Sequence, residues 1–233
     1  MMKILVTFAM SIASLIFAVP MAAAQDWNGA YVGFSLGFDK GDVDWTDNNG
    51  GWFTFAPGTM HSATGHGLGG GAHFGRNWQS GNNLVTGLEF SVSGLGNSRA
   101  VTSPLFPASD TWNTEVGTVI AATGRLGFAS NKFMPYIEGG VAAGAVSMTN
   151  TDVVFCGATP CVFSSREWQT GWVAGIGLDY MASDNFSIGV NYRMADFGST
   201  THAGTTSGTA IAENFTVSAK SQVLSIRLNW LLK

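Results

Sequence analysis

Residues 116–145 read VGTVIAATGRLGFASNKFMPYIEGGVAAGA, two segments of alternating side chains around a short turn at residues 129–132. Because side chains alternate faces along a strand, each segment has one apolar face and one face of glycine, alanine and single charges. The apolar faces hold Val116, Thr118, Ile120, Ala122, Gly124, Leu126 and Phe128 in the first segment, and Pro135, Ile137, Gly139, Val141 and Ala143 in the second. They carry no charge over roughly the 9–11 residues that a tilted strand needs to cross a bilayer. This pattern is typical of a transmembrane β-barrel.

Three stretches of the sequence carry a resemblance to a known family. GRLGF at 124–128 with PYIEGGVA at 135–142 resembles the central hairpin of the small outer-membrane β-barrel family of Gram-negative bacteria, with its porin-like and OmpA-like members. DWNGAYVG at 26–33 resembles that family's W-x-G-x-Y-V-G opening, and residues 170–198 resemble a second family hairpin. The resemblance implies location in the outer membrane, contact with outer-membrane lipid and insertion by the barrel-assembly machinery. It also implies a final aromatic residue, whereas this sequence reads WLLK at 230–233.

The composition excludes several classes of protein. Apolar residues make up 45% of the chain but charged residues only 11%, against about 25% charged in ordinary soluble domains. The 31 glycines are too many for a helical protein, and beyond the N-terminal segment no run reaches the roughly 18 apolar residues of a spanning helix. A barrel instead spreads its apolar residues over alternate positions. The formal net charge of −4 gives no electrostatic basis for binding nucleic acid.

The N-terminal segment has the features of a secretory signal peptide. Lys3 is its only charge, residues 4–19 are apolar, and alanines 22 and 24 supply the small residues of a cleavage site. We therefore expect residues 1–24 to be a signal peptide cleaved after Ala24, and residues 25–233 to form one outer-membrane barrel domain. A buried N-terminal helix is the alternative, which the cationic start and the small-residue end disfavour.

The connections between the expected strands alternate between long and short. Long polar segments at 39–62, 94–111, 147–166 and 199–214 alternate with tight turns at 79–83, 129–132 and 181–185. Four long loops and three turns join eight strands, with the short turns periplasmic and the long loops extracellular. Because backbone groups in lipid need internal partners, the sheet must close. The sequence thus predicts an all-β fold, an eight-stranded antiparallel up-and-down transmembrane β-barrel, with Trp27 and Tyr31 in an interfacial aromatic belt.

Both cysteines of the chain, Cys156 and Cys161, lie in the third long segment. Export to an oxidising compartment favours a disulfide between them, and their spacing differs from the C-x-x-C of a redox motif. A bridge that closes so short a loop contributes roughly 2–3 kcal/mol at most. We expect it mainly to order the tip of that loop.

Six charged residues fall on the inward faces of the expected strands. They are Glu89, Arg125, Glu138, Asp179, Arg193 and Arg227. The interior of an eight-stranded barrel is only wide enough for side chains to fill, and buried charges are costly unless they are paired. Three acids and three bases therefore predict a salt-bridged plug, with Glu138, on the next strand, as the first candidate partner of Arg125. The alternative is a lumen that conducts protons or ions.

The sequence offers little for catalysis or for cofactor binding. The four histidines are His61, His66, His73 and His202. They are scattered, and none pairs with a serine and an acid in a recognisable motif. His61 and His66 could ligate a metal or haem, but two loop histidines five residues apart are more often solvated. Gly67, Gly69 and Ala72 fit the G-x-G-x-x-A of a dinucleotide site, without the following helix that such a site needs. We expect no catalytic, metal or cofactor site.

The sequence therefore predicts a non-enzymatic outer-membrane protein with a side-chain-filled lumen and four long extracellular loops that meet the environment. Two alternatives stay open. One is a narrow porin that passes small solutes, which single-channel conductance would reveal. The other is an adhesin or haem-binding surface protein whose loops bind an extracellular ligand or a host surface. No nucleic-acid partner and no cofactor are expected.

Overall fold

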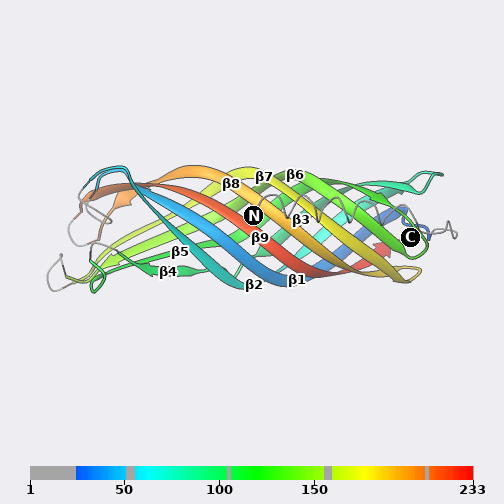
Figure 1. The fold of residues 1–233 in the computed structure, drawn as a ribbon, viewed down its shortest axis with the longest axis horizontal. Helices are drawn as coiled ribbons and strands as arrows, with labels where there is room; N and C mark the ends of the chain where they lie inside the picture. The colour runs from blue at the N-terminus through cyan, green and yellow to red at the C-terminus, as the bar shows by residue number, and fades with distance from the viewer. Residues whose placement is uncertain (1–24, 51–55, 104–105, 155–158, 208–209, 233) are drawn as a thin grey trace, which may run out of the picture.

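The computed structural model describes residues 25–50, 56–103, 106–154, 159–207 and 210–232, which form a tall barrel of antiparallel strands (Figure 1). The strands are β1 (Gly29–Asp47), β2 (Thr59–Gln79), β3 (Leu84–Gly94), β4 (Arg99–Thr102), β5 (Asp110–Phe128), β6 (Phe133–Asp152), β7 (Cys161–Ser183), β8 (Phe186–Thr205) and β9 (Ala212–Leu232). Among the described residues, no helix is long and apolar enough to span a bilayer. The expected signal peptide, residues 1–24, lies outside the described residues, so cleavage after Ala24 stays a prediction.

Eight strand positions close the ring. The strands pair antiparallel with their neighbours in the order β3, β2, β1, β9, β8, β7, β6, β5. β3 also pairs with β5, from Leu84 opposite Phe128 to Gly94 opposite Thr118, which joins the two ends of the sheet. The short β4 pairs with β5 beyond that point and so continues the place of β3. The predicted eight-stranded antiparallel up-and-down barrel is confirmed.

The strands continue well into the segments that the sequence predicts as long loops. β1 has 19 residues and ends at Asp47 rather than near Asp39, while β6 continues to Asp152 and β8 to Thr205. A tilted strand needs only about 9–11 residues to cross a bilayer. The barrel therefore rises past the membrane, and its four connecting loops are shorter than predicted.

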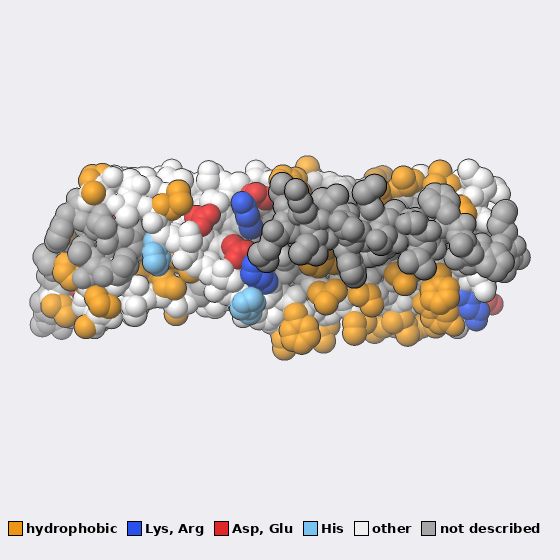
Figure 2. Space-filling view, in the orientation of Figure 1, with side chains coloured by type: hydrophobic (Ala, Val, Ile, Leu, Met, Phe, Trp, Pro, Cys, Tyr) orange, Lys and Arg blue, Asp and Glu red, His pale blue; other side chains and the backbone are white. Residues whose placement is uncertain are grey.

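The half of the barrel next to the short turns has an apolar outer wall. Phe34, Phe38 and Val141 are 61%, 71% and 65% exposed there, and Figure 2 shows hydrophobic side chains gathered over this half. Exposed aromatic residues ring its end near the turns. They include Trp78, Phe133, Tyr180 and Trp230. An apolar band with an aromatic girdle is the lipid-facing wall of an outer-membrane barrel, and in barrels of this class the short turns lie at the periplasmic end.

The other half reverses this pattern on the same strands. On β1 the outward residues change from apolar Phe38 to charged Asp42, and inward Trp45 is fully buried. On β9 Leu224 faces out, whereas Phe215, nearer the loops, is buried inside. The register between β1 and β9 is continuous across this point, without a bulge. The inward and outward positions therefore stay the same along each strand, and it is the apolar residues that move from the outward to the inward positions. Above the membrane the chain is built like a water-soluble barrel with an apolar interior.

Three predicted side-chain directions are wrong. Trp27 and Tyr31 are only 1% and 2% exposed and point into the barrel instead of lying in an outer aromatic belt. Val116, expected on the lipid face, is fully buried. A register shift between Val116 and Val119 adds a residue to β5, which reverses the facing of every residue before it. β8 has a second shift between Asp196 and Ser199.

Candidate functional site

The six predicted lumen charges meet in one layer inside the membrane-spanning half, each from a different strand. They are Glu89 on β3, Arg125 on β5, Glu138 on β6, Asp179 on β7, Arg193 on β8 and Arg227 on β9. All face inward, and five of them are nearly inaccessible to solvent, while the Arg193 side chain is 20% exposed. We call this set the charge layer.

Glu89 lies at the centre of the charge layer. It accepts a hydrogen bond from Arg227 Nη1 at 3.1 Å and is in contact with Arg227 Nη2 as well. Arg193 Nη2 donates to Glu89 Oε1 at 3.2 Å, and Arg125 Nη1 lies 3.8 Å from Glu89 Oε2. The hydroxyl of Tyr31 donates to the same carboxylate at 2.7 Å. One carboxylate thus connects three arginines, which keeps a buried cluster of charges neutralised.

Arg125 does not bind Glu138, its predicted partner. The two residues are opposite each other in the ladder between β5 and β6, but Arg125 Nη2 donates to Asp179 Oδ2 at 3.1 Å. Its guanidinium also lies over the ring of Tyr136, 3.9 Å from the centroid. The carboxylate of Glu138 is already held by Arg193, so the first candidate was wrong. Alternation predicts which face a side chain takes, and the length of an arginine decides how far it reaches.

Inward glycines make room for these side chains. A Cβ built on Gly175 would lie 2.7 Å from Glu138 Oε1, and one on Gly189 would collide with the carboxylate of Asp179. A Cβ on Gly75 would collide with the hydroxyl of Tyr31, and one on Gly177 with the hydroxyl of Tyr136. The glycine content of the sequence therefore has a packing role, because each glycine leaves the space that a neighbouring strand's large side chain occupies.

A second layer, which we call the extracellular core, fills the barrel from the upper part of the apolar belt to the level of the long connections. It consists of Val43, Trp45, Trp112, Val116, Val119, Ala142, Val146, Met148, Phe163, Val173, Phe197, Phe215, Val217 and Ala219. The ring centroids of Trp45 and Trp112 are 6.0 Å apart, and Phe215 lies 5.1 Å from both Trp112 and Phe163. Trp45 Nε1 donates to Thr114 Oγ1 at 2.9 Å. This layer was not predicted from the sequence, although the alternation of Val43 and Trp45 with aspartates was its signal.

A third layer closes the periplasmic mouth, and we call it the periplasmic cluster. Its members are Trp27, Tyr31, Val85, Ala129, Met134, Tyr136, Met181 and Leu231. The segment before β1 crosses the mouth and is tied to three different turns. The Gln25 amide donates to Asn131 O at 2.8 Å and its side chain to Asp184 at 3.2 Å, while the Trp27 amide donates to Gln79 Oε1 at 2.7 Å. These bonds hold the Trp27 ring inside the barrel end.

Two small cavities lie between the charge layer and the extracellular core. Their volumes are about 60 and 40 Å³, and Ser91, Ser93, Leu95, Arg193 and Val223 line both. Each cavity borders polar side chains and has room for water.

The histidines are not arranged for ligation or catalysis. His61 stacks on Trp45 inside the barrel, 6.1 Å between ring centroids, whereas His66 is exposed on the outer face of the same strand. His73 meets Asn229 in the lumen at 2.6 Å, and His202 is fully buried in the extracellular half. Within the described ranges no three His, Cys, Asp or Glu residues are grouped to hold a metal.

Two further sequence hypotheses concern the cysteines and the glycine-rich stretch. Cys161 begins β7 and is buried, but Cys156 lies outside the described residues, so the disulfide stays a prediction. Gly67 and Gly69 lie within β2, in the barrel wall. No helix follows them among the described residues, which removes the dinucleotide interpretation.

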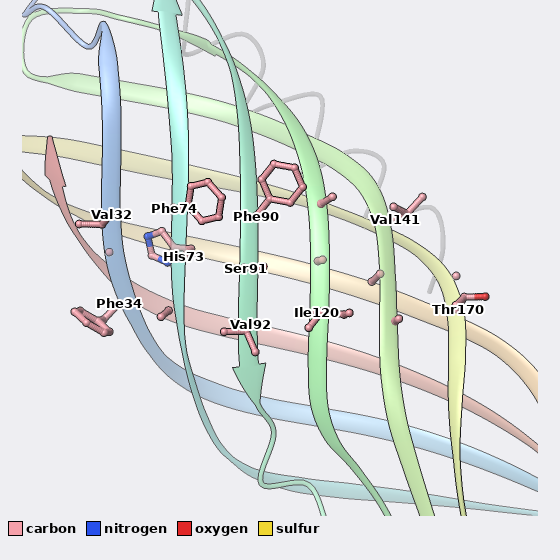
Figure 3. Close-up of a pocket in the computed structure, with 17 residues that line it drawn as sticks. Val32, Phe34, His73, Phe74, Phe90, Ser91, Val92, Ile120, Val141 and Thr170 are labelled. Atoms are coloured by element: carbon pink, nitrogen blue, oxygen red, sulfur yellow. The ribbon is translucent and has the colours of Figure 1, made fainter. Parts of the chain in front are cut away.

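The lipid-facing wall has a shallow apolar hollow across β1, β2, β3, β5, β6 and β7 (Figure 3). Phe74 and Phe90 stack beside it with ring centroids 5.4 Å apart. His73 and Ser91 also border it, but their polar atoms bind Asn229 and Arg193 in the lumen. The hollow thus presents hydrocarbon to the membrane, which suits lipid chains and offers no reactive group.

Comparison with known proteins agrees with this architecture. Residues 9–227 match the family of the outer membrane protein β-barrel domain. The chain is 30% identical over 195 residues to the 31 kDa outer-membrane immunogenic protein of Brucella melitensis, covering 78% of this chain and 77% of that protein. It is 26% identical over 182 residues to the 22 kDa outer membrane protein of Rhizobium leguminosarum, covering 77% and 69%.

Among solved structures, the outer membrane protease OmpT from Escherichia coli superposes with a TM-score of 0.55 at 9% identity, covering 91% of this chain and 99% of that one. At that identity the likeness concerns the fold alone. The family match and the Brucella relative, together with the closed barrel and its apolar belt, place the protein in the outer membrane of a Gram-negative bacterium. The chain belongs to the outer membrane protein β-barrel domain family.

Proposed function

We propose that this protein is a non-enzymatic structural and surface protein of the outer membrane whose lumen does not conduct. The observation that carries this proposal is the filling of the lumen at three successive levels, by the periplasmic cluster, the charge layer and the extracellular core. The cavities between the upper two layers are small, about 60 and 40 Å³. A hydrated ion would have to displace paired charges and a packed aromatic cluster to pass.

Conductance of single barrels in planar bilayers tests this proposal. We expect no steady current steps from the wild-type protein under conditions in which a general porin, used as the positive control, gives steady steps. Reproducible channels from the intact protein would contradict the closed lumen and favour a narrow porin. In that case substitutions in the charge layer should change ion selectivity, because charged rings control the selectivity of pores.

We further propose that the extramembrane half displays the connecting loops to the environment. Relatives named outer-membrane immunogenic proteins support an exposed surface in this family. Exposed apolar residues lie at the described loop ends, with Val153 at 50%, Val154 at 67% and Ile211 at 53% exposure. Exposed apolar side chains favour contact with another surface, so an extracellular ligand or a host surface is the partner we propose for these loops.

An epitope tag separates this arrangement from the opposite one. A tag inserted after Val154 should bind antibody on intact cells, whereas a tag at Asn82, in the short turn between β2 and β3, should bind only after the outer membrane is permeabilised. The reverse result would contradict the proposed topology. Loss of both signals together with loss of the folded barrel would indicate failed insertion by the assembly machinery, and a shorter tag at the same sites would then decide.

A further inference from the structure

Charged and hydrogen-bonding side chains form a rim on the outer wall where the apolar belt ends. Lys40 on β1 lies opposite His66 on β2 and Gln222 on β9, and all three face outward. Lys220 lies one outward position further along β9. Figure 2 shows basic, acidic and histidine side chains together near the middle of the molecule, at the edge of the hydrophobic field. The rim is on the side of the belt away from the periplasmic turns, at the level of the outer leaflet.

An apolar row lies directly below this rim. Phe38 is opposite both Leu68 and Leu224, with exposures of 71%, 61% and 51%. The apolar row lies two positions from the rim along each strand, a rise of roughly 7 Å. The apolar row and three rim residues, Lys40, His66 and Gln222, line one hollow that runs across β8, β9, β1 and β2, and Lys220 lies beyond it on the loop side. The hollow is therefore polar toward the outside and apolar toward the membrane.

The rim keeps hydrogen-bond donors available. Lys40 Nζ lies 3.1 Å from Asp42 Oδ2, and Lys220 Nζ lies 3.6 Å from Asp196 Oδ2. The lysine side chains are 44% and 54% exposed, and each ammonium has three donors. Exposed ion pairs of this kind contribute little to stability, so turning a lysine from its aspartate toward another anion costs little. Tyr192 donates to Gln222 Oε1 at 2.8 Å, which leaves the amide nitrogen of Gln222 as a further donor.

We propose that this rim and the apolar row below it bind one phosphate-bearing lipid of the outer leaflet. The headgroup phosphate contacts Lys40 and Lys220, with Gln222 and His66 beside it. The acyl chains lie against Phe38 and its neighbours in the apolar row. A phosphate-bearing lipid carries an anion and hydrocarbon in the same order along the membrane normal as this wall carries its lysines and its apolar side chains. The proposal does not depend on whether the lumen conducts.

Native mass spectrometry of the full-length mature barrel in detergent tests the proposal, with diphosphoryl lipid A as the probe. We expect one lipid to remain bound to the wild-type protein. The double variant Lys40→Ala/Lys220→Ala should weaken binding about 10- to 30-fold, because losing one lysine next to an anionic lipid weakens binding by about three- to fivefold. Lys132→Ala, in a periplasmic turn, is the matched control and should bind like the wild type. Heat-modifiable migration on gels shows that each variant is folded.

Three results would overturn the proposal. The first is equal binding by the double variant and by Lys132→Ala. The second is equal wild-type binding of an uncharged lipid with the same chains, which would reduce the contact to hydrocarbon. The third is inorganic phosphate binding as tightly as lipid A, because the apolar row would then contribute nothing. If the double variant fails to fold, the affinity of the wild-type protein for lipid A is measured at salt concentrations from about 0.05 to about 0.5 M. An affinity that stays constant over this range would exclude recognition of the lipid's charge and overturn the proposal.

Discussion

The guanidinium of Arg193 makes two parallel hydrogen bonds to the carboxylate of Glu138, from Nε to Oε1 at 2.9 Å and from Nη2 to Oε2 at 2.9 Å. Such a bidentate pair fixes the relative orientation of its two side chains. Arg193 is on β8 and Glu138 on β6, with β7 between them in the sheet. Arg125 and Asp179 likewise connect β5 with β7. The charge layer therefore joins strands that are not hydrogen-bonded neighbours and stabilises the ring across its interior.

Removing one member of the Arg125–Asp179 pair should destabilise the barrel. Both side chains are 2% exposed, so Arg125→Ala leaves a buried carboxylate without its cation, at a cost of about 3–5 kcal/mol. Adding Asp179→Ala should recover part of that loss. The measurement is urea unfolding and refolding in lipid vesicles. Arg166→Ala, at an exposed position above the membrane, is the control. A double variant no more stable than Arg125→Ala would argue against the pair.

Charge on the outer wall should be tolerated above the membrane and not within it. Val141→Arg should cost about 2–4 kcal/mol if the residue lies near the bilayer midplane. Thr149→Arg, on the same face of β6 and exposed, should change the free energy of unfolding by less than about 0.5 kcal/mol. Refolding of both variants into the same vesicles gives the comparison. Equal losses would mean that the membrane extends beyond the apolar belt.

The Trp27 ring should control access to the periplasmic end of the lumen. Met134 is fully buried in the same cluster, so a Met134→Cys probe, in a background without the two native cysteines, should react slowly with a membrane-impermeant maleimide. Adding Trp27→Ala should make the probe react much faster, because the ring is removed from the mouth. A Trp27→Phe variant should stay slow. Fast labelling of Met134→Cys with Trp27 intact would refute the closed mouth.

The extracellular half should lose stability in mild acid. Burial lowers the pKa of His202, an effect that nearby Glu167 partly opposes. Gln169 Nε2 lies 3.4 Å from His202 Nε2. Protonation of His202 would place two N–H donors opposite each other and remove this hydrogen bond. Below the usual histidine pKa of about 6.5 the unfolded chain binds more protons than the folded one, and stability falls as the pH falls. Amide hydrogen exchange of β8 and β9 at pH 7.5 and 5.5 measures this. His202→Gln should remove the part of the dependence that this site causes.

Alternation along the strands predicted most of the fold and the whole set of lumen charges. From Val119 to Phe128 on β5, the pattern correctly predicts which side chains point into the barrel and which point outward. It failed at Val116, where a bulge adds a residue that no side-chain pattern announces. The extramembrane strands were missed because polar residues such as Asp42 and Asp44 alternate with Val43 and Trp45, and only the outward set was weighed. Arg125 pairs with Asp179 because its long side chain extends across the lumen past the neighbouring strand. The order of the strands along the chain does not reveal that pairing.

The change of apolar face partway along β1 and β9 has a consequence for how this surface can diversify. Above the membrane, every second residue of these strands packs into the extracellular core and the residues between them meet the exterior. Selection for a changed outer surface and selection for a stable fold therefore act on alternate residues of the same segment. A lineage under pressure to alter its outer surface could replace residues such as Asp42, Asp44, Thr216 and Ser218 while Val43, Trp45, Phe215 and Val217 stay constant. Substitutions along these segments should accumulate with a period of two.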